Sequence, residues 1–192
     1  MKSSITSSRK RNNVNAAIAR TTALLIGLAI VGITGCASPA AREAMSAQNL
    51  TLAKKHPYDV SVKTQGGSET GAMDSSNISD ADLKAAIESS IAESKLFKSV
   101  IQGKGGDYEL NVTVTQMSKP MFGTSFTVDL ETGWSLVKAS DKSVAMRKAI
   151  KSSHTATMGD SLVGVARLRM AVEGAARKNI AEGLAAISAL DL

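Results

Sequence analysis

The only cysteine of the chain, Cys36, is the residue whose type and position predict a defined reaction. It ends the sequence Ile33-Thr34-Gly35-Cys36, directly after the apolar run ALLIGLAIVGIT at residues 23–34. Five cationic residues and no acidic residue precede this run. A basic start, an apolar core of about a dozen residues and small residues before a cleavage position are typical of an export signal. The core is shorter than the ~20 residues that span a bilayer. We therefore expect cleavage between Gly35 and Cys36.

Ile33-Thr34-Gly35-Cys36 resembles the lipobox of bacterial lipoproteins, in which an aliphatic residue and two small residues precede a cysteine. Leucine is commoner than isoleucine at the first position. The resemblance implies that a diacylglycerol is joined to the sulfur of Cys36 and that the new amino terminus can take an acyl chain such as palmitate. Ala37, rather than aspartate, follows the cysteine. In enterobacterial lipoproteins this favours the outer membrane, with the protein facing the periplasm.

Cleavage would change the charge of the chain. The precursor has 23 lysines and arginines against 17 acidic residues, and all five cations of the leader would leave with it. The mature chain of 157 residues would then carry 18 cations and 17 acids, so that it is nearly neutral. A basic surface for nucleic acid is not expected, and six aromatic residues offer little for stacking bases. With no second cysteine an internal disulfide is impossible, so one domain with a packed core is expected.

The remaining residues with chemical potential do not form a recognisable catalytic pattern. His56 and His154 are far apart, and neither has a second histidine at a metal-ligand spacing. Asp129 and Glu131 would lie about 7 Å apart on one face of a strand, which a polar sheet face explains equally well. We predict no catalytic residue, metal or cofactor, and a protein that is not an enzyme. An envelope hydrolase or transferase that uses His154 is kept as the second alternative.

Two groups of residues are candidates for binding. Arg169, Glu173 and Arg177 are spaced i, i+4 and i+8 on a predicted helix, where they can form a ladder of ion pairs. The ladder is a candidate partner-binding surface, although a solvated helix face is the plainer interpretation. The second group could line the mouth of a cavity for a lipid or other apolar ligand, or could be core and loop residues: Met117, Met121, Phe122 and Met158.

The periodicity of apolar residues predicts an α+β fold. Alternation with period two predicts strands, and spacing of three to four residues predicts helices. Ser79 and Asp82 resemble a capping box at the start of the first helix, and Asp160 can cap the second. The glycines of the second helix suggest close packing on the sheet, or a bend. The expected order is β-α-β-β-β-α, a mainly antiparallel four-stranded sheet with two helices on one face, with strands near 58–64, 108–115, 125–137 and 144–155 and helices near 80–98 and 161–189.

The expected organisation has three parts: a signal peptide at 1–35, a lipid anchor and tether at 36–57, and a single periplasmic domain at 58–192. Its element order behind a lipobox is similar to that of Gram-negative envelope lipoproteins, including YajG-like lipoproteins, auxiliary lipoproteins of ABC-type lipid transport and activator lipoproteins of penicillin-binding proteins. That resemblance implies docking to other envelope proteins. The leading hypothesis is an outer-membrane lipoprotein that acts as a non-catalytic binding or scaffolding module. The first alternative is a periplasmic carrier of an apolar ligand.

Overall fold

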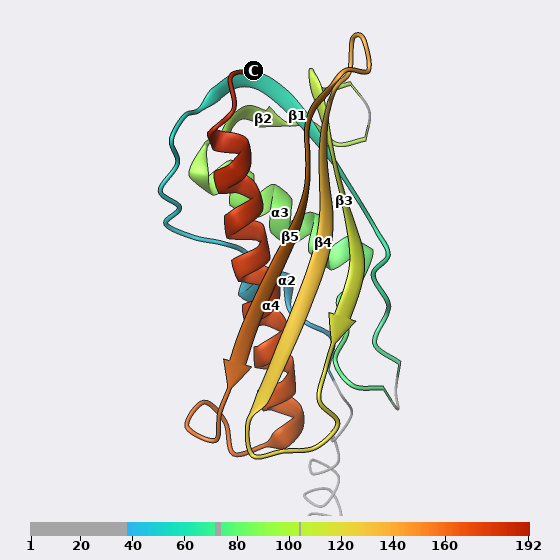
Figure 1. Ribbon diagram of the computed structural model, residues 1–192, viewed down its shortest axis with the longest axis vertical. Helices are drawn as coiled ribbons and strands as arrows, with labels where there is room; N and C mark the ends of the chain where they lie inside the picture. The colour runs from blue at the N-terminus through green and yellow to red at the C-terminus, as the bar shows by residue number, and fades with distance from the viewer. Residues whose placement is uncertain (1–37, 72–73, 104) are drawn as a thin grey trace, which may run out of the picture. The chain divides into compact units, whose positions relative to one another are not determined.

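The computed structural model describes residues 38–71, 74–103 and 105–192, and these residues form an α+β fold with a five-stranded sheet and three helices (Figure 1). In chain order the elements are α2 (Arg42–Met45), β1 (His56–Gln65), α3 (Asp80–Ser94), β2 (Phe97–Val100), β3 (Tyr108–Ser118), β4 (Phe126–Lys138), β5 (Val144–Ala156) and α4 (Gly164–Ser188). The α+β class predicted from the sequence is confirmed.

The sheet is mixed rather than mainly antiparallel. Its strand order is β2-β1-β3-β4-β5. The β3-β4-β5 meander is antiparallel, as its alternating pattern predicts. β1, however, pairs in parallel with both β2 and β3. α3 carries the chain back so that β2 starts beside His56, and β3 then continues in the same direction from Val60 onward, on the other side of β1. The predicted count of four strands and two helices is therefore wrong in detail.

The strand that the sequence analysis missed is β2, which was assigned to the end of a longer helix. Phe97 falls at helical spacing from Ile91 and Ser94, so that the apolar pattern continues past the true end of the helix. The helix ends where Lys95 adopts a left-handed conformation with φ of 53°. Because that position usually holds glycine or asparagine, a lysine gave no stop signal.

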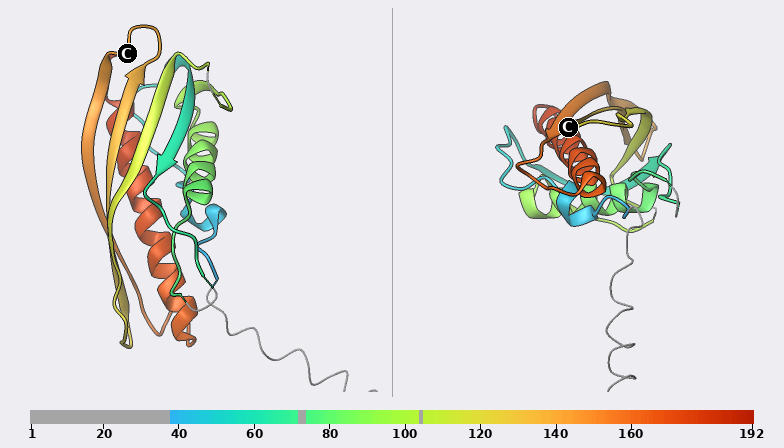
Figure 2. Two further views of the ribbon diagram at one scale, coloured as in Figure 1. Left: turned by 90° about the vertical axis from the view of Figure 1, so that its right-hand side faces the viewer. Right: turned by 90° about the horizontal axis from the view of Figure 1, so that it is seen from below.

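α3 and α4 cover the same face of the sheet, and the other face stays open (Figure 2). α4 packs on β4 and β5, whereas α3 packs on β1 and β2. Two glycines let α4 approach closely, as the sequence suggested. A Cβ at Gly183 would lie 2.5 Å from the ring of Trp134, and one at Gly174 would overlap the His154 ring.

A buried polar network fixes α4 against the sheet. The Trp134 ring N–H donates to Thr132 Oγ1 (2.8 Å) and to Asn179 Oδ1 (3.1 Å). The Thr132 hydroxyl also donates to Asn179 Oδ1 (2.6 Å), and the Asn179 amide donates to the carbonyl of Ile150 (3.1 Å). All the polar groups of the network are therefore satisfied inside the core, which specifies one register of helix on sheet.

Part of the segment expected to be a tether packs against α3 and α4. Met45, in α2, is fully buried, and Ala40 and Ala47 are 2% exposed. The Ala47 N–H donates to Ser90 Oγ on α3 (2.9 Å), and the Ala53 N–H donates to Ser188 Oγ on α4 (3.2 Å). Small and apolar side chains of this segment thus pack between α3 and α4. Their spacing in the sequence is too irregular to predict this packing.

The capping predictions had mixed results. Ser79 caps α3 as expected, since its hydroxyl accepts a hydrogen bond from the Asp82 N–H (3.1 Å). Asp160 does not cap α4, which begins after Val163 without a side-chain cap. Instead the Asp160 carboxylate accepts from the N–H (2.7 Å) and hydroxyl (2.9 Å) of Thr157, and so closes the turn before the helix.

Candidate functional site

The predicted lipid-attachment and cleavage residues, Cys36 and Gly35, lie outside the described residues. The first described residue is Ser38, two positions after the cysteine. Its carbonyl accepts a hydrogen bond from the hydroxyl of Ser76 (2.8 Å), and the Ala40 N–H donates to the carbonyl of Asn77 (3.2 Å). The chain is therefore fixed to the domain within four residues of the expected anchor.

The predicted ladder on α4 holds this segment in place. Glu173 is largely buried, and its Oε1 accepts from the Ala41 N–H (2.9 Å) and faces Arg169 Nε at 3.5 Å. Arg177 donates to the carbonyl of Ala44 (2.8 Å) rather than pairing with Glu173. The structure thus brings Arg169, Glu173 and Arg177 together on one face, and that face binds the protein's own N-terminal segment. The sequence showed the spacing but not the partner.

Both histidines pack against α4. His56 is buried, and its Nε2 lies 3.0 Å from the carbonyl of Ile187. His154 lies flat against Gly174, where there is no room for a Cβ. Burial lowers the pKa of His154, and the cations of Lys178 and Arg177 lower it further, while Asp160 opposes them. The pKa of His154 therefore lies below that of a free histidine.

The paired carboxylates lie on the open face of the sheet. Glu131 forms a cross-strand ion pair with Lys151 (3.1 Å), and Asp129 lies opposite Ser153 in the register of β4 and β5. A cross-strand pair of this kind is a common stabilising device on a sheet face. Among the described residues, no group of three histidine, aspartate or glutamate side chains is placed to hold a metal ion.

The four apolar residues proposed as the mouth of a cavity do not surround one space. Met121 and Phe122 are 84% and 86% exposed, and Met158 is 51% exposed. Met117 instead packs against the core and borders a separate cavity of about 250 Å³. Exposure of this degree leaves no enclosing wall for a small apolar ligand.

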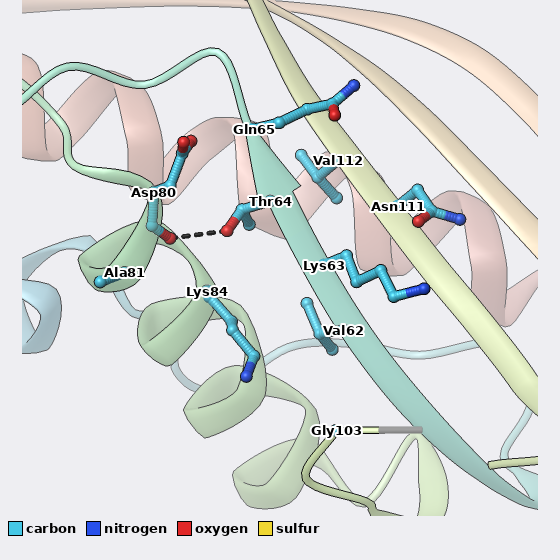
Figure 3. A pocket seen from close by; sticks show the side chains of 10 residues that line it. All are labelled: Val62, Lys63, Thr64, Gln65, Asp80, Ala81, Lys84, Gly103, Asn111 and Val112. Atoms are coloured by element: carbon cyan, nitrogen blue, oxygen red, sulfur yellow. Dashed lines mark hydrogen bonds between the residues drawn. The ribbon is translucent and has the colours of Figure 1, made fainter. Parts of the chain in front are cut away.

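A groove of about 700 Å³ lies between β1 and the first turns of α3 (Figure 3). β2 accompanies β1 only to Val60, where the Ile101 N–H donates to the Val60 carbonyl (2.8 Å). Within the described residues, the rest of β1 has a neighbouring strand only on the β3 side. The groove residues are Val62, Lys63, Thr64, Gln65, Asp80, Ala81, Lys84, Gly103, Asn111 and Val112.

Six of the ten groove residues have polar side chains. The Thr64 hydroxyl donates to the carbonyl of Asp80 (2.6 Å) and fixes the end of β1 to the start of α3 (Figure 3). Lys63 pairs with Glu109 at 3.3 Å and holds the pKa of that carboxyl below its ordinary value. Lys84 pairs with Glu88 on its own helix (3.5 Å). An unpaired strand edge flanked by hydrogen-bonding side chains can accept an extended peptide.

No family model and no curated protein sequence matches the chain. Solved structures do resemble it. A DUF330 protein of Xanthomonas campestris matches with a TM-score of 0.57 and 15% identity, over 77% of this chain and 90% of that one. A hypothetical protein of Chlamydia trachomatis matches with a TM-score of 0.52 and 8% identity, over 71% and 96% of the two chains. At these identities the likeness shows a shared fold.

Proposed function

We propose that this chain is a lipoprotein of the cell envelope, anchored through Cys36 in the outer membrane, that acts as a non-catalytic periplasmic binding module. One observation carries the proposal. The folded domain reaches to within two residues of Cys36, since the carbonyl of Ser38 accepts a hydrogen bond from the hydroxyl of Ser76 (2.8 Å). The expected leader and the folded domain therefore meet at the cysteine of Ile33-Thr34-Gly35-Cys36, where cleavage and lipid attachment would leave the domain complete.

None of the described helices has the length and apolarity to cross a bilayer. A covalent diacylglycerol with an added acyl chain would give the stable binding that one acyl chain alone does not. The basic leader and the neutral remainder both fit export of the domain away from the cytoplasm.

The groove beside β1 is the proposed binding site, and its occupant is an extended segment of another envelope protein. Backbone groups at the free edge of β1 would supply the hydrogen bonds, and Lys63, Lys84 and Asp80 would select among partners. The carrier alternative has less support, since three of the four residues on which it rested are exposed to solvent and the fourth, Met117, borders a separate cavity. The hydrolase alternative depended on His154, which is occupied in packing.

Metabolic labelling with a fatty-acid analogue tests the anchor. The wild-type chain should become labelled and should fractionate with the outer membrane. Cys36→Ala should lose the label and keep its leader, which gel mobility reveals. Equal labelling of the two chains would disprove attachment at Cys36, and fractionation with the inner membrane would disprove the outer-membrane assignment.

Photo-crosslinking in cells tests the groove. A photoreactive residue at Gln65, at the exposed end of the groove, should give a discrete protein adduct. Gln116, an equally exposed glutamine on β3 away from the groove, is the matched control. Equal adducts at Gln65 and Gln116, or none at either, would show that the groove is not the docking site.

A further inference from the structure

The exposed apolar side chains of the domain gather at one end. Seven large hydrophobic side chains are exposed among the described residues. Six of them lie in or next to two loops, the β3–β4 loop (residues 119–125) and the β5–α4 loop (residues 157–163). The six are Met121, Phe122, Met158, Leu162, Val163 and Val165. The seventh, Val144, begins β5 at the opposite end of that strand. Clustering of this kind marks an interaction surface rather than scattered surface residues.

The two loops are neighbours, and both are held in position. The last residue of β5, Ala156, pairs with the first residue of β4, Phe126. The β5–α4 loop therefore starts next to the point where the β3–β4 loop ends. Arg167 stacks its guanidinium 5.3 Å from the centre of the Phe126 ring and donates to the carbonyls of Ser161 (2.8 Å) and Leu162 (3.1 Å). The buried Arg167 therefore fixes the β5–α4 loop, whose apolar side chains stay exposed.

The described chain begins at this same end. Lys119, at the start of the β3–β4 loop, donates through Nζ to the carbonyl of Ser76 (2.9 Å). The Ser76 hydroxyl in turn donates to the carbonyl of Ser38 (2.8 Å). Figures 1 and 2 show both loops and the start of the described chain at the lower end of the domain, while the β4–β5 hairpin and the C-terminus lie at the upper end.

The short stretch of chain between Cys36 and Ser38 limits how far this end of the domain can lie from the membrane. Two residues, even fully extended, span about 7 Å. If Cys36 carries lipid in the bilayer interface, Ser38 must lie within about that distance of it. Because residues 40–47 are packed into the domain, no long tether lifts the loops away from the membrane surface.

We infer that the apolar tips of the β3–β4 and β5–α4 loops insert into the membrane that holds the Cys36 lipid, and so fix the orientation of the domain on it. The inference rests on the proposed function and names the membrane surface as a second, non-covalent binding partner of the anchored protein. Lys119 and Asp160 are the charged residues of the two loops, and their charges cancel. The surface thus suits the acyl boundary of a bilayer better than an anionic headgroup layer.

A single-thiol experiment tests the insertion on the full-length, lipidated protein. Lipidation would consume the only native thiol, so that an introduced cysteine can be labelled alone. Phe122→Cys and Leu162→Cys would carry an environment-sensitive fluorophore, and Ser140→Cys, in the exposed β4–β5 hairpin, is the control. Each protein is reconstituted in phosphatidylcholine vesicles with or without bromine on the acyl chains. Emission of the buried Trp134 checks that each variant is folded.

The probes at 122 and 162 should shift to shorter wavelength and lose emission in brominated vesicles, while the probe at 140 should do neither. If the protein floats with the vesicles but all three probes behave alike, the insertion is wrong and the anchor stands. If the protein does not float with the vesicles and its Cys36 thiol still reacts with a thiol reagent, the proposed function fails and the inference fails with it. A photoreactive residue at 122 that gives a discrete protein adduct in cells, without quenching by bromolipid, would reassign the surface to a protein partner.

Discussion

Contacts of single residues determine how closely α4 packs on the sheet, and Gly183 leaves no room for a larger side chain. Gly183→Ala would place a Cβ 2.5 Å from the Trp134 ring. We expect it to lower the free energy of unfolding by about 1–3 kcal/mol, the usual cost of overpacking a core. Urea unfolding followed by Trp134 emission measures this, because Trp134 is the only tryptophan of the chain.

Gly164→Ala is the matched control for this prediction. It makes the same chemical change at the first residue of α4, where the nearest atoms to a new Cβ are 3.8 Å or farther. We expect no loss of stability, and at most about 1 kcal/mol of gain, because alanine restricts the unfolded chain more than glycine does. Equal midpoints for the two variants would show that the close contact at Gly183 does not constrain the packing.

His154 gives a prediction about pH. Burial lowers its pKa, and Lys178 and Arg177 lower it further. Because the unfolded chain then binds the proton more readily than the folded one, stability is full above the unfolded pKa of about 6.5 and declines as the pH falls through the folded pKa. An NMR titration of His154 should show a pKa below that of a free histidine.

Lys178→Gln should raise the pKa of His154 because it removes one of the two repelling cations. Lys151→Gln, on the open face of the sheet, removes a cation that does not contribute to the shift and serves as the control. A His154 pKa at or above the ordinary value in the wild-type protein, or an equal rise in both variants, would contradict the role of burial and of Lys178.

At the scale of elements, the N-terminal segment depends on Glu173 on α4. Glu173→Ala removes the acceptor of the Ala41 N–H and leaves Arg169 without its facing carboxylate. We expect a loss of about 1–3 kcal/mol, as for a buried partner removed from a hydrogen bond. Hydrogen exchange should accelerate at residues 40–47 before it does so in the sheet.

Glu182→Ala, at an exposed position of the same helix, should leave exchange in residues 40–47 unchanged. If Glu173→Ala also leaves it unchanged, the segment is held by its apolar residues alone. The comparison separates the effect of the buried carboxylate from the general effect of replacing a glutamate in α4.

The elements differ in how well the sequence predicts them, for physical reasons. The sequence predicts the bounds of β4 and β5 to within one residue. Burial alternates strictly along β4, whereas along β5 the exposed Lys148 interrupts the alternation of the buried residues Met146, Ile150 and Ser152. The sequence does not reveal β2, because the strand has only four residues and Phe97 continues the helical spacing of apolar residues in α3. The parallel pairing of β1 was also missed, since strand neighbours are set by the path of the chain through α3 and not by local pattern.

The candidate site was less predictable than the fold. The spacing of Arg169, Glu173 and Arg177 shows that they share a helix face, but only the tertiary structure shows that this face is occupied by residues 41–44. The free edge of β1 could not be expected while β2 was unknown. Met121 and Phe122 are candidates for a cavity mouth in the sequence, and only the structure shows that they are exposed in a loop.

At the scale of the whole molecule, the two ends of the domain differ in chemistry. The end with Ser38 presents the apolar tips of the β3–β4 and β5–α4 loops. The other end carries the hairpin with Asp141 and Lys142 together with the exposed pair of Lys54 and Asp191. Anchoring through Cys36 would therefore place the apolar end on the bilayer and turn the charged end toward the periplasm. The groove beside β1 lies on the flank between them and would stay open to a partner.

The balance of forces at the apolar end predicts how insertion responds to salt. Attraction between a cationic surface and anionic lipid is screened over about 10 Å at 0.1 M ionic strength, whereas burial of apolar surface is not weakened by screening. The charges of Lys119 and Asp160 cancel. Bromolipid quenching of the probe at 122 should therefore be the same at about 0.05 M and 0.5 M salt. It should also be the same in neutral and in anionic vesicles. Asp160→Lys, which makes the loops cationic, should introduce a dependence on both. Quenching of the unaltered loops that disappeared at high salt would mean that charge, and not apolar contact, holds the domain to the membrane.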